Sequence, residues 1–273
     1  MKKITRLGLI LMLGVVLILA ACGSGEKSSG GSSDSDGEEK KTLKVVTDAA
    51  YAPMEYLEGD KTVGFDVDFI KAIAEEAGYE IDVVHVGWDP IFVEIEKKTA
   101  DLAISSITIN EERKESYDFS VPYYLSTNKI LIPEDSDIVS GEDLKDKIIA
   151  VQNGTTGQEV AEAILGKNHE NIKKFENNNL AIQELLSGGA DAVIADNTVI
   201  EYYAKMNPDQ KLKVVADNSF DAEYYGVMFQ KGSELVSEFD KAINKIYDSG
   251  KYAEIYKEWF GNDPDVENLK AQQ

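Results

Sequence analysis

The chain has two arginines, Arg6 and Arg113, whereas lysine supplies the rest of its positive side-chain charge. Arg6 lies in an N-terminal segment that we expect to be removed, so Arg113 would be the one arginine of the mature chain. A guanidinium is planar and always charged, and it pairs with a carboxylate through two parallel hydrogen bonds that an ammonium group cannot copy. Arg113 therefore predicts a site for a carboxylate, with a surface arginine left by chance as the alternative.

A second group of candidate residues lies at the ends of predicted strands. In open α/β sheets a ligand binds beside the carboxyl ends of the strands, so side chains placed there are candidates for contact. Asp196 directly follows the predicted strand 191–195 and suits an ammonium group, although it could instead cap the helix that follows. The other polar or aromatic residues at or just after such strand ends are Asp48, Trp88, Ser105, Ser106 and Thr108.

The segment Gly154–Gly157 (GTTG) follows a predicted strand and opens a predicted helix. The first backbone N–H groups of a helix have no partner within it, so they point outward and favour an anion. Thr155 and Thr156 therefore belong with Arg113 on the side of the site that would hold a carboxylate, while Asp196 would hold an ammonium. Together these residues predict a site for the zwitterion of an α-amino acid.

The hydrophobic pattern predicts the framework that positions these residues. Strand-like apolar runs alternate with helix-like stretches, which is typical of parallel βαβ units. The pattern restarts near residue 148, so two α/β lobes are expected rather than one sheet. Predicted strands are 43–46, 81–86, 102–105, 148–152, 191–195, 212–215 and 224–230, and predicted helices are 66–77, one capped by Asp89 with Pro90 as its first residue, 157–165, 180–186, 197–205, 233–249 and 251–260.

The N-terminus has a basic start followed by an apolar run from Leu7 to Ala21, which is too short for a stable membrane span and is typical of a secretory signal. The run ends in Leu19-Ala20-Ala21-Cys22, which resembles the lipobox of bacterial lipoproteins and implies a lipid on Cys22, the only cysteine. The stretch after it is rich in Gly, Ser and acids, so it is expected to be a flexible tether. We therefore predict a signal peptide over 1–21 and a lipidated linker over 22–42, with the protein held on the extracellular face of a cell membrane as in Gram-positive lipoproteins.

Charge and histidine content argue against several classes of function. The formal net charge is −22, so a surface that binds nucleic acid is not expected. The two histidines, His85 and His169, are far apart in the sequence, and a nucleophile–histidine pair, a zinc cluster and a phosphate-binding glycine loop all lack obvious parts. We therefore predict no cofactor, no metal and no catalytic activity.

Several longer motifs resemble a single family. They are Val63–Asp68 (VGFDVD), Gly87–Asp89 (GWD), Ile107–Tyr124 (ITINEERKESYDFSVPYY), Gln152–Gln158 (QNGTTGQ), Gly189–Asn197 (GADAVIADN) and Lys251–Gly261 (KYAEIYKEWFG). In this order they resemble the family 3 solute-binding proteins of amino-acid ABC importers, closest to the branch that binds basic amino acids, and the likeness covers nearly everything from Leu43 to Gly261. The resemblance implies the α/β periplasmic-binding-protein type 2 fold, in which two mainly parallel sheets flanked by helices form two lobes joined by a two-strand hinge.

The resemblance implies roles for the residues that would hold the charged groups of the ligand. Arg113 would clamp the α-carboxylate, helped by the hydroxyl of Thr108 and by the helix start at Thr155 and Thr156. Asp196 would bind the ammonium group.

It also implies roles for the remaining candidates. Ser105 and Ser106 would contact the ammonium and the carboxylate through backbone or hydroxyl groups. Tyr51 and Trp88 match the aromatic pair that flanks the ligand side chain, and Asp48 would reach the distal end of that side chain.

Two aromatic residues and an acid favour a flat or cationic ligand side chain. A guanidinium or ammonium between Tyr51 and Trp88 would gain about 1–2 kcal/mol for each well-desolvated cation–π contact. Asp48 would add a charge-assisted hydrogen bond and Gln152 a further one. Arginine, lysine or histidine is therefore the expected ligand, and glutamine is the runner-up because an aspartate also accepts from an amide.

The predicted organisation places lobe 1 over 43–128 and 222–262, lobe 2 over 129–221, and a frayed tail over 263–273. Strands over 124–131 and 224–230 would join the lobes. A ligand that touches both lobes would favour their closure, and the closed monomer would then dock on the membrane permease of an ABC importer.

Two other functions remain open from the sequence. The same cleft could serve an amino-acid sensor lipoprotein, which would differ only in its partner. The family also contains rare dehydratases on this fold, so an enzyme is a remote alternative.

Overall fold

The computed structural model describes residues 40–273, which form one compact unit, and residues 1–39 lie outside the described part. The predicted signal peptide, the lipid on Cys22 and the linker up to residue 39 fall in that outside segment and stay predictions. Thr42, expected to end the linker, already belongs to the first strand. Within residues 40–273, no helix is long and apolar enough to cross a membrane.

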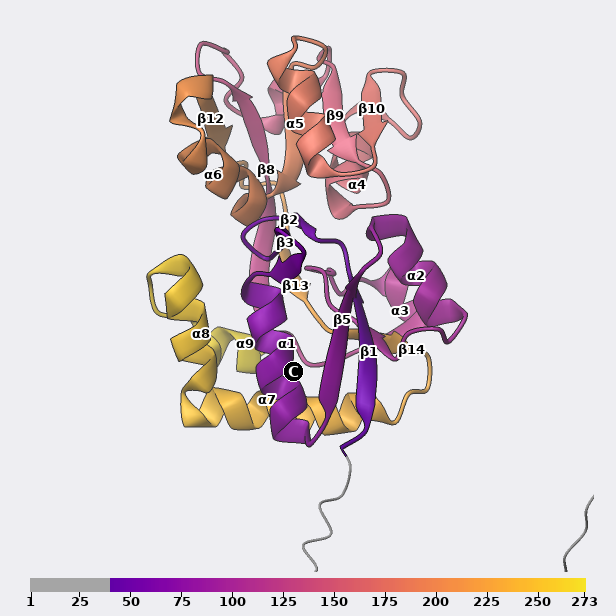
Figure 1. The fold of residues 1–273 in the computed structure, drawn as a ribbon. Coiled ribbons are helices and arrows are strands. Elements are labelled where there is room, and N and C mark those ends of the chain that lie inside the picture. The colour runs from indigo at the N-terminus through magenta and orange to yellow at the C-terminus, as the bar shows by residue number, and fades with distance from the viewer. Residues whose placement is uncertain (1–39) are drawn as a thin grey trace, which may run out of the picture. The chain divides into compact units, whose positions relative to one another are not determined.

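Lobe 1 is built on a five-stranded sheet (Figure 1). Its strands are β1 (Thr42–Thr47), β5 (Glu80–His85), β6 (Leu102–Ala103), β7 (Tyr117–Phe119) and β14 (Met228–Gln230), and its helices are α1 (Phe65–Ala77), α2 (Trp88–Glu96), α3 (Glu111–Ser116), α7 (Leu235–Ser249), α8 (Lys251–Phe260) and α9 (Val266–Lys270). The strand order is β5-β1-β6-β14-β7, with β1 parallel to β5 and β6, and β14 antiparallel to β6 and β7. The parallel part confirms the βαβ reading of the first half of the pattern.

Lobe 2 is built on a second sheet. Its strands are β8 (Tyr124–Pro133), β9 (Ile149–Gln152), β10 (Ile172–Phe175), β11 (Ala192–Asp196), β12 (Leu212–Val215) and β13 (Ala222–Tyr225), and its helices are α4 (Thr156–Leu165), α5 (Asn178–Leu186) and α6 (Asn197–Met206). The strand order is β10-β9-β11-β8-β12, and β13 pairs with β8 beside this path. The three strands β10, β9 and β11 are parallel, whereas β8 runs antiparallel to β11 and β12.

Both faces of the lobe 2 sheet are covered, which explains why its inner strands β9 and β11 are largely apolar and fully buried. Successive residues of β8 pack into different clusters because side chains alternate across a strand. Ile130 and Ile132 pack in the cluster that contains Ala161 of α4, whereas Leu131 packs in the one that contains Ile182 of α5. One helix layer therefore covers each face.

Helix α1 carries much of the lobe 1 core. Phe65, Phe69, Ile70 and Ile73 share one face and are fully buried, and each such side chain contributes about 1.5–3 kcal/mol relative to exposure. The helix ends at Gly78, whose φ of 88° lies in the left-handed region that favours glycine. The predicted helix over 66–77 is confirmed, and it begins one residue earlier.

A small antiparallel sheet of β2 (Ala50–Tyr51), β3 (Glu55–Glu58) and β4 (Lys61–Val63) was not predicted. Its strands have two to four residues, too few for a periodic signal to emerge from the sequence. This small sheet matters because it carries Tyr51 and Glu55 to the site.

Two chain crossings join the lobes, as the two-strand hinge requires. Strand β8 passes from one lobe to the other (Figure 1), pairing first with β13 and then with β11 and β12. The strand predicted over 224–230 is instead two strands, β13 and β14, separated at Gly226 and Val227. A Cβ on Gly226 would lie 2.8 Å from the Ile109 side chain, so a glycine allows the chain to change partners here.

Two further predictions need correction. Helix α2 begins at Trp88 after Gly87, so Asp89 lies in its first turn and is not its cap. The C-terminal residues expected to fray form α9, which is capped by the Asp265 side chain and buries Leu269 against the lobe 1 core. The sequence did not predict this helix, because a single buried leucine gives no periodic hydrophobic pattern.

Gly64, between β4 and α1, is expected to be essential for stability. Its φ is +137°, and a Cβ there would lie 2.1 Å from the backbone oxygen of Met54. We expect Gly64→Ala to lower the free energy of unfolding by about 3 kcal/mol or more, because backbone must move. The matched control is Gly59→Ala, where φ is +62° and nothing lies within 4 Å, so the cost should be only about 1–2 kcal/mol. Urea unfolding of residues 40–273 measures both, and equal costs would contradict the steric argument.

Candidate functional site

All the residues predicted to bind a ligand line one cavity between the lobes. The cavity lies at the carboxyl ends of β1, β6 and β11, where the sequence placed it. The role of each residue in binding stays a prediction, but their meeting in one place is a finding. The lining residues are Asp48, Tyr51, Trp88, Ser105, Ser106, Thr108, Arg113, Gln152, Thr155, Thr156 and Asp196, together with Glu55, which was not predicted.

Arg113 enters the cavity from α3, a short helix whose N-cap is the Asn110 side chain. Its guanidinium donates to two backbone oxygens, those of Thr108 at 2.9 Å and Gly154 at 3.4 Å, and lies 5.4 Å from the centre of the Trp88 ring. Among residues 40–273, no carboxylate forms an ion pair with it. Desolvation lowers the pKa of Arg113, while the negative charge of Glu159 opposes that shift. The site thus holds a desolvated guanidinium that still has N–H donors for a ligand.

The start of α4 lies on the same side of the cavity. Thr155 is the N-cap, and its hydroxyl accepts from the Gln158 backbone N–H. Gly157 brings this helix start close to β11, because a Cβ there would lie 2.7 Å from the backbone oxygen of Ile194. The helix N-terminus and Arg113 therefore form the donor half of the cavity.

Asp196 forms the acceptor part of the cavity. It is 6% exposed, and its Oδ2 accepts from the hydroxyls of Tyr51 at 2.6 Å and Tyr225 at 2.5 Å. Burial raises the pKa of Asp196, and the two tyrosine hydrogen bonds and Arg113 oppose this effect. Asp196 precedes α6, but its side chain makes no capping hydrogen bond, so the cap alternative does not account for it. Within residues 40–273, Oδ1 has no hydrogen-bond partner and remains available to a ligand.

The end of the cavity near Asp48 is lined by a linked pair. Gln152 donates from Nε2 to Oδ2 of Asp48 at 3.2 Å, and the Asn178 amide donates to Oε1 of Gln152 at 2.8 Å. Burial raises the pKa of Asp48, and the hydrogen bond from Gln152 opposes it. The Asp48 carboxylate is therefore held at this end of the cavity as a hydrogen-bond acceptor, with Gln152 fixed beside it.

Residues of the two lobes contact each other directly around the cavity. Tyr51 bonds to Asp196, Asp48 bonds to Gln152, and the Trp88 Nε1 donates to the backbone oxygen of Gly154 at 3.3 Å. Each pair joins lobe 1 to lobe 2. The lobes are thus closed upon each other, and a ligand must exchange several of these contacts for its own.

Glu55 is a lining residue that sequence reasoning missed. It is fully buried, and its Oε1 accepts from the Ser105 hydroxyl at 2.8 Å. Burial and the nearby negative charge of Asp66 raise the pKa of Glu55 well above its usual range, and the pKa of Asp66 is raised to about 6, chiefly by burial. Asp66 in turn accepts from the backbone N–H of Ser106, which holds a left-handed φ of 50°. An acid flanked by apolar residues in the run PMEYL was the available signal.

Within the described part of the chain, no group of three or more His, Cys, Asp or Glu side chains is placed to hold a metal ion. The cavity is lined by the Arg113 cation, buried carboxylates, hydroxyls and aromatic rings. These groups suit the reversible binding of a small charged molecule.

Two α/β lobes closed around a polar cavity define a two-lobed solute-binding protein. Residues 43–262 match the family described as bacterial extracellular solute-binding proteins, family 3, and the chain belongs to that family.

The relatives of this chain include binding proteins named for basic amino acids. The chain is 36% identical over 250 residues to a probable histidine-binding protein of Neisseria gonorrhoeae, a match that covers 90% of this chain and 92% of the relative. It is 36% identical over 249 residues to the arginine-binding extracellular protein ArtP of Bacillus subtilis (strain 168), covering 90% and 97%. The solved arginine-, lysine-, histidine-binding protein ArtJ of Geobacillus stearothermophilus is 50% identical, with a TM-score of 0.83 over 84% of this chain and 100% of that chain.

Proposed function

We propose that this protein captures a basic L-amino acid outside the cell and delivers it to an ABC importer permease. The observation that carries the proposal is the desolvated Arg113 guanidinium, which among residues 40–273 hydrogen-bonds only to backbone oxygens. Asp196 lines the same cavity, and within residues 40–273 its Oδ1 has no hydrogen-bond partner. A cation and an anion fixed in one small space complement the two charges of an α-amino acid.

The ligand would span the cavity from the donor half to Asp48. Its carboxylate would lie between Arg113 and the start of α4, and its ammonium would lie against Asp196. The side chain would extend past Tyr51 and Trp88 toward Asp48. This placement gives each charged group of the ligand an opposite charge in the protein.

The charges of the cavity favour a cationic side chain. Among residues 40–273, Arg113 is the only cationic side chain that lines it, whereas Asp48, Glu55 and Asp196 are all acids. A zwitterion brings no net charge, so it leaves the excess of acid in place. A guanidinium, ammonium or imidazolium near Asp48 would offset it, which agrees with the names of ArtP and ArtJ.

Closure follows from contacts with both lobes. Arg113, Trp88 and Tyr51 belong to lobe 1, whereas Thr156 and Asp196 belong to lobe 2. A ligand that binds both sets stabilises the closed state by its differential affinity for the two states. A lipid on Cys22 would keep the protein near the permease, and the protein would act as a monomer without a cofactor. We propose binding, not catalysis, as its activity.

Calorimetry of residues 40–273 against the twenty amino acids tests the proposal, after unfolding and refolding to remove any bound ligand. Binding of arginine, lysine or histidine is expected. Binding of glutamine alone would preserve the fold and function but overturn the role given to Asp48. Binding of none would overturn the proposed function and favour the dehydratase alternative, which product analysis would then examine. A permease-dependent uptake assay distinguishes transport from sensing.

The Asp48 carboxylate should decide between arginine and glutamine. We expect Asp48→Asn to weaken arginine binding by about ten- to a hundredfold, because a charge-assisted hydrogen bond contributes about 1.5–3 kcal/mol, and to change glutamine binding by less than about threefold. Asp60→Asn, an exposed aspartate of the same lobe, is the control. An equal loss for both ligands would contradict a role in side-chain selection.

A further inference from the structure

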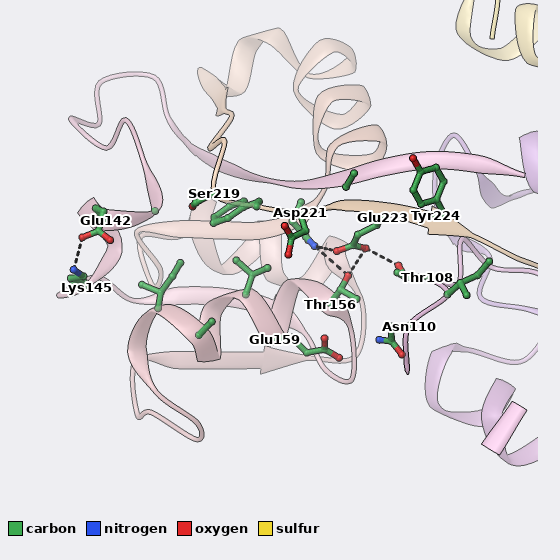
Figure 2. A pocket seen from close by; sticks show the side chains of 18 residues that line it. Thr108, Asn110, Glu142, Lys145, Thr156, Glu159, Ser219, Asp221, Glu223 and Tyr224 are labelled. Carbon is green, nitrogen blue, oxygen red and sulfur yellow. Dashed lines mark hydrogen bonds and ion pairs between the residues drawn. The ribbon is translucent and has the colours of Figure 1, made fainter. Parts of the chain in front are cut away.

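A groove lies next to the ligand cavity, and the two share Thr108 and Thr156 in their linings. Figure 2 shows the side chains that line the groove. These two threonines line both the cavity and the groove, so they form part of the wall between them. Glu223 of β13 lies in this wall on the groove side and does not line the cavity. It is an acid on the hinge strand that the proposed function leaves without a role.

Glu223 receives hydrogen bonds from both lobes, as Figure 2 shows. The Thr108 hydroxyl of lobe 1 donates to its Oε2 at 2.7 Å, and the Thr156 hydroxyl of lobe 2 donates to the same oxygen at 2.8 Å. The Asn128 amide of β8 donates to Oε1 at 2.5 Å. Three donors therefore fix one partly buried carboxylate.

These hydrogen bonds determine what the threonines can offer to a ligand. A hydroxyl has one proton and two lone pairs. Because the proton of Thr108 is directed to Glu223, its oxygen can only accept from a group in the cavity. The oxygen of Thr156 has its proton directed the same way and already accepts from Asn128 at 3.2 Å. The hydroxyl of Thr108 therefore cannot donate to the ligand carboxylate, the help that the family resemblance implied.

We propose that Glu223 is a positioning residue for the ammonium group of the ligand: by taking the proton of the Thr108 hydroxyl, it turns that oxygen into a second acceptor in the cavity that Asp196 also lines. This inference rests on the proposed function and deepens it. Arg113 and the start of α4 then bind the carboxylate alone, and the acceptor half of the cavity consists of Asp196 and Thr108. Glu223 acts through Thr108 and does not touch the ligand.

The electrostatic setting of Glu223 supports this role. Burial and the charge of Asp196 raise the pKa of Glu223 to about 7, while Thr108, Thr156 and Arg113 oppose the shift. Glu159 of α4 and Asp221 line the same groove. An ammonium bound nearby favours the ionised acid and lowers its pKa, so binding releases a proton near neutral pH. Arginine affinity should therefore fall as pH drops from 8 to 6, and this share of the pH dependence should be absent in Glu223→Gln.

A double-mutant cycle with two ligands tests the inference. The variants are Glu223→Gln, Thr108→Val and the double variant, and the ligands are L-arginine and 5-guanidinopentanoate, which is arginine without its α-amino group. We expect Glu223→Gln to weaken arginine binding by about tenfold or more and to change binding of the amine-free ligand by less than about threefold. In the Thr108→Val background, the same substitution should weaken arginine binding by less than about threefold. Displacement assays measure the affinity of 5-guanidinopentanoate, which is expected to bind weakly.

The control is Glu142→Gln, a groove glutamate whose side chain pairs only with Lys145 within the described residues. Equal losses for both ligands in Glu223→Gln would show that Glu223 only supports the fold, and additive effects in the cycle would show that it does not act through Thr108. Either result overturns the inference while leaving the proposed function intact. A wild-type protein that binds neither ligand nor any other amino acid overturns the proposed function first, and this inference with it.

Discussion

Replacing Arg113 by alanine should weaken the binding of arginine, lysine or histidine by about a hundredfold or more. Losing one partner of a buried, hydrogen-bonded charge pair costs about 2–5 kcal/mol, because the carboxylate of the ligand is left poorly paired. Arg113→Lys should restore little, since an ammonium cannot make the two parallel hydrogen bonds that a guanidinium makes. Isothermal titration calorimetry on both variants measures these losses.

The same substitution should have little effect on stability. The guanidinium makes hydrogen bonds only to backbone oxygens of Thr108 and Gly154, and its desolvation is uncompensated by an ion pair among residues 40–273. We therefore expect Arg113→Ala to change the free energy of unfolding without ligand by less than about 1 kcal/mol. Lys114→Ala, which removes the adjacent exposed cation that pairs with Glu111, should change neither affinity nor stability. Near-normal affinity in Arg113→Ala would refute the site.

The elements and their order were accessible from the sequence because their patterns are local. Helix α1 shows a buried stripe at Phe69, Ile70 and Ile73, and a glycine ends it. Strand β12 and helix α8 occur over the residues predicted, 212–215 and 251–260. Each of these depends on spacing within a few residues, so the chain itself displays it.

The cavity was accessible for a different reason. Strand ends carry function in α/β sheets, so Asp48, Ser105 and Asp196 could be assigned to one site without knowing their distances. That Arg113 joins them followed from residue type, since lysine would have served a solvated surface equally well. The types of residue at the predicted strand ends therefore indicated which side chains line the cavity.

Contacts between distant segments could not be read in this way. The sequence gives no signal for Glu223, because its partners Thr108 and Asn128 are 115 and 95 residues away. Glu55 begins the four-residue strand β3, which is too short to show a periodic pattern, and its importance depends on Asp66 and Ser105. The sequence shows that an acid is present, but only the packing shows that it is buried.

Substituting Asp196 by asparagine should separate binding from stability. An ionised Asp196 would face the ligand ammonium, so Asp196→Asn should weaken arginine binding by about a hundredfold, or about 2.7 kcal/mol. This lies within the range of about 2–5 kcal/mol for losing one partner of a buried charge pair. Asp209→Asn, an exposed aspartate of the same lobe, should leave affinity unchanged. Calorimetry at pH 8 checks both.

Asp196→Asn should not lower the stability of the ligand-free protein at pH 8, although it weakens ligand binding. Burial raises the pKa of Asp196 above its unfolded value, so its contribution to stability is fully present below the unfolded pKa and is lost as pH rises through the folded one. At pH 8 the ionised acid therefore opposes folding, and Asp196→Asn, which resembles the protonated acid, should unfold at an equal or higher urea concentration than the wild type. The difference should shrink as pH falls through the folded pKa of Asp196, because the wild-type acid then takes up a proton. A variant that loses both affinity and stability at pH 8 would show that Asp196 chiefly supports the fold, since the two tyrosine hydrogen bonds would then outweigh the cost of burying its charge.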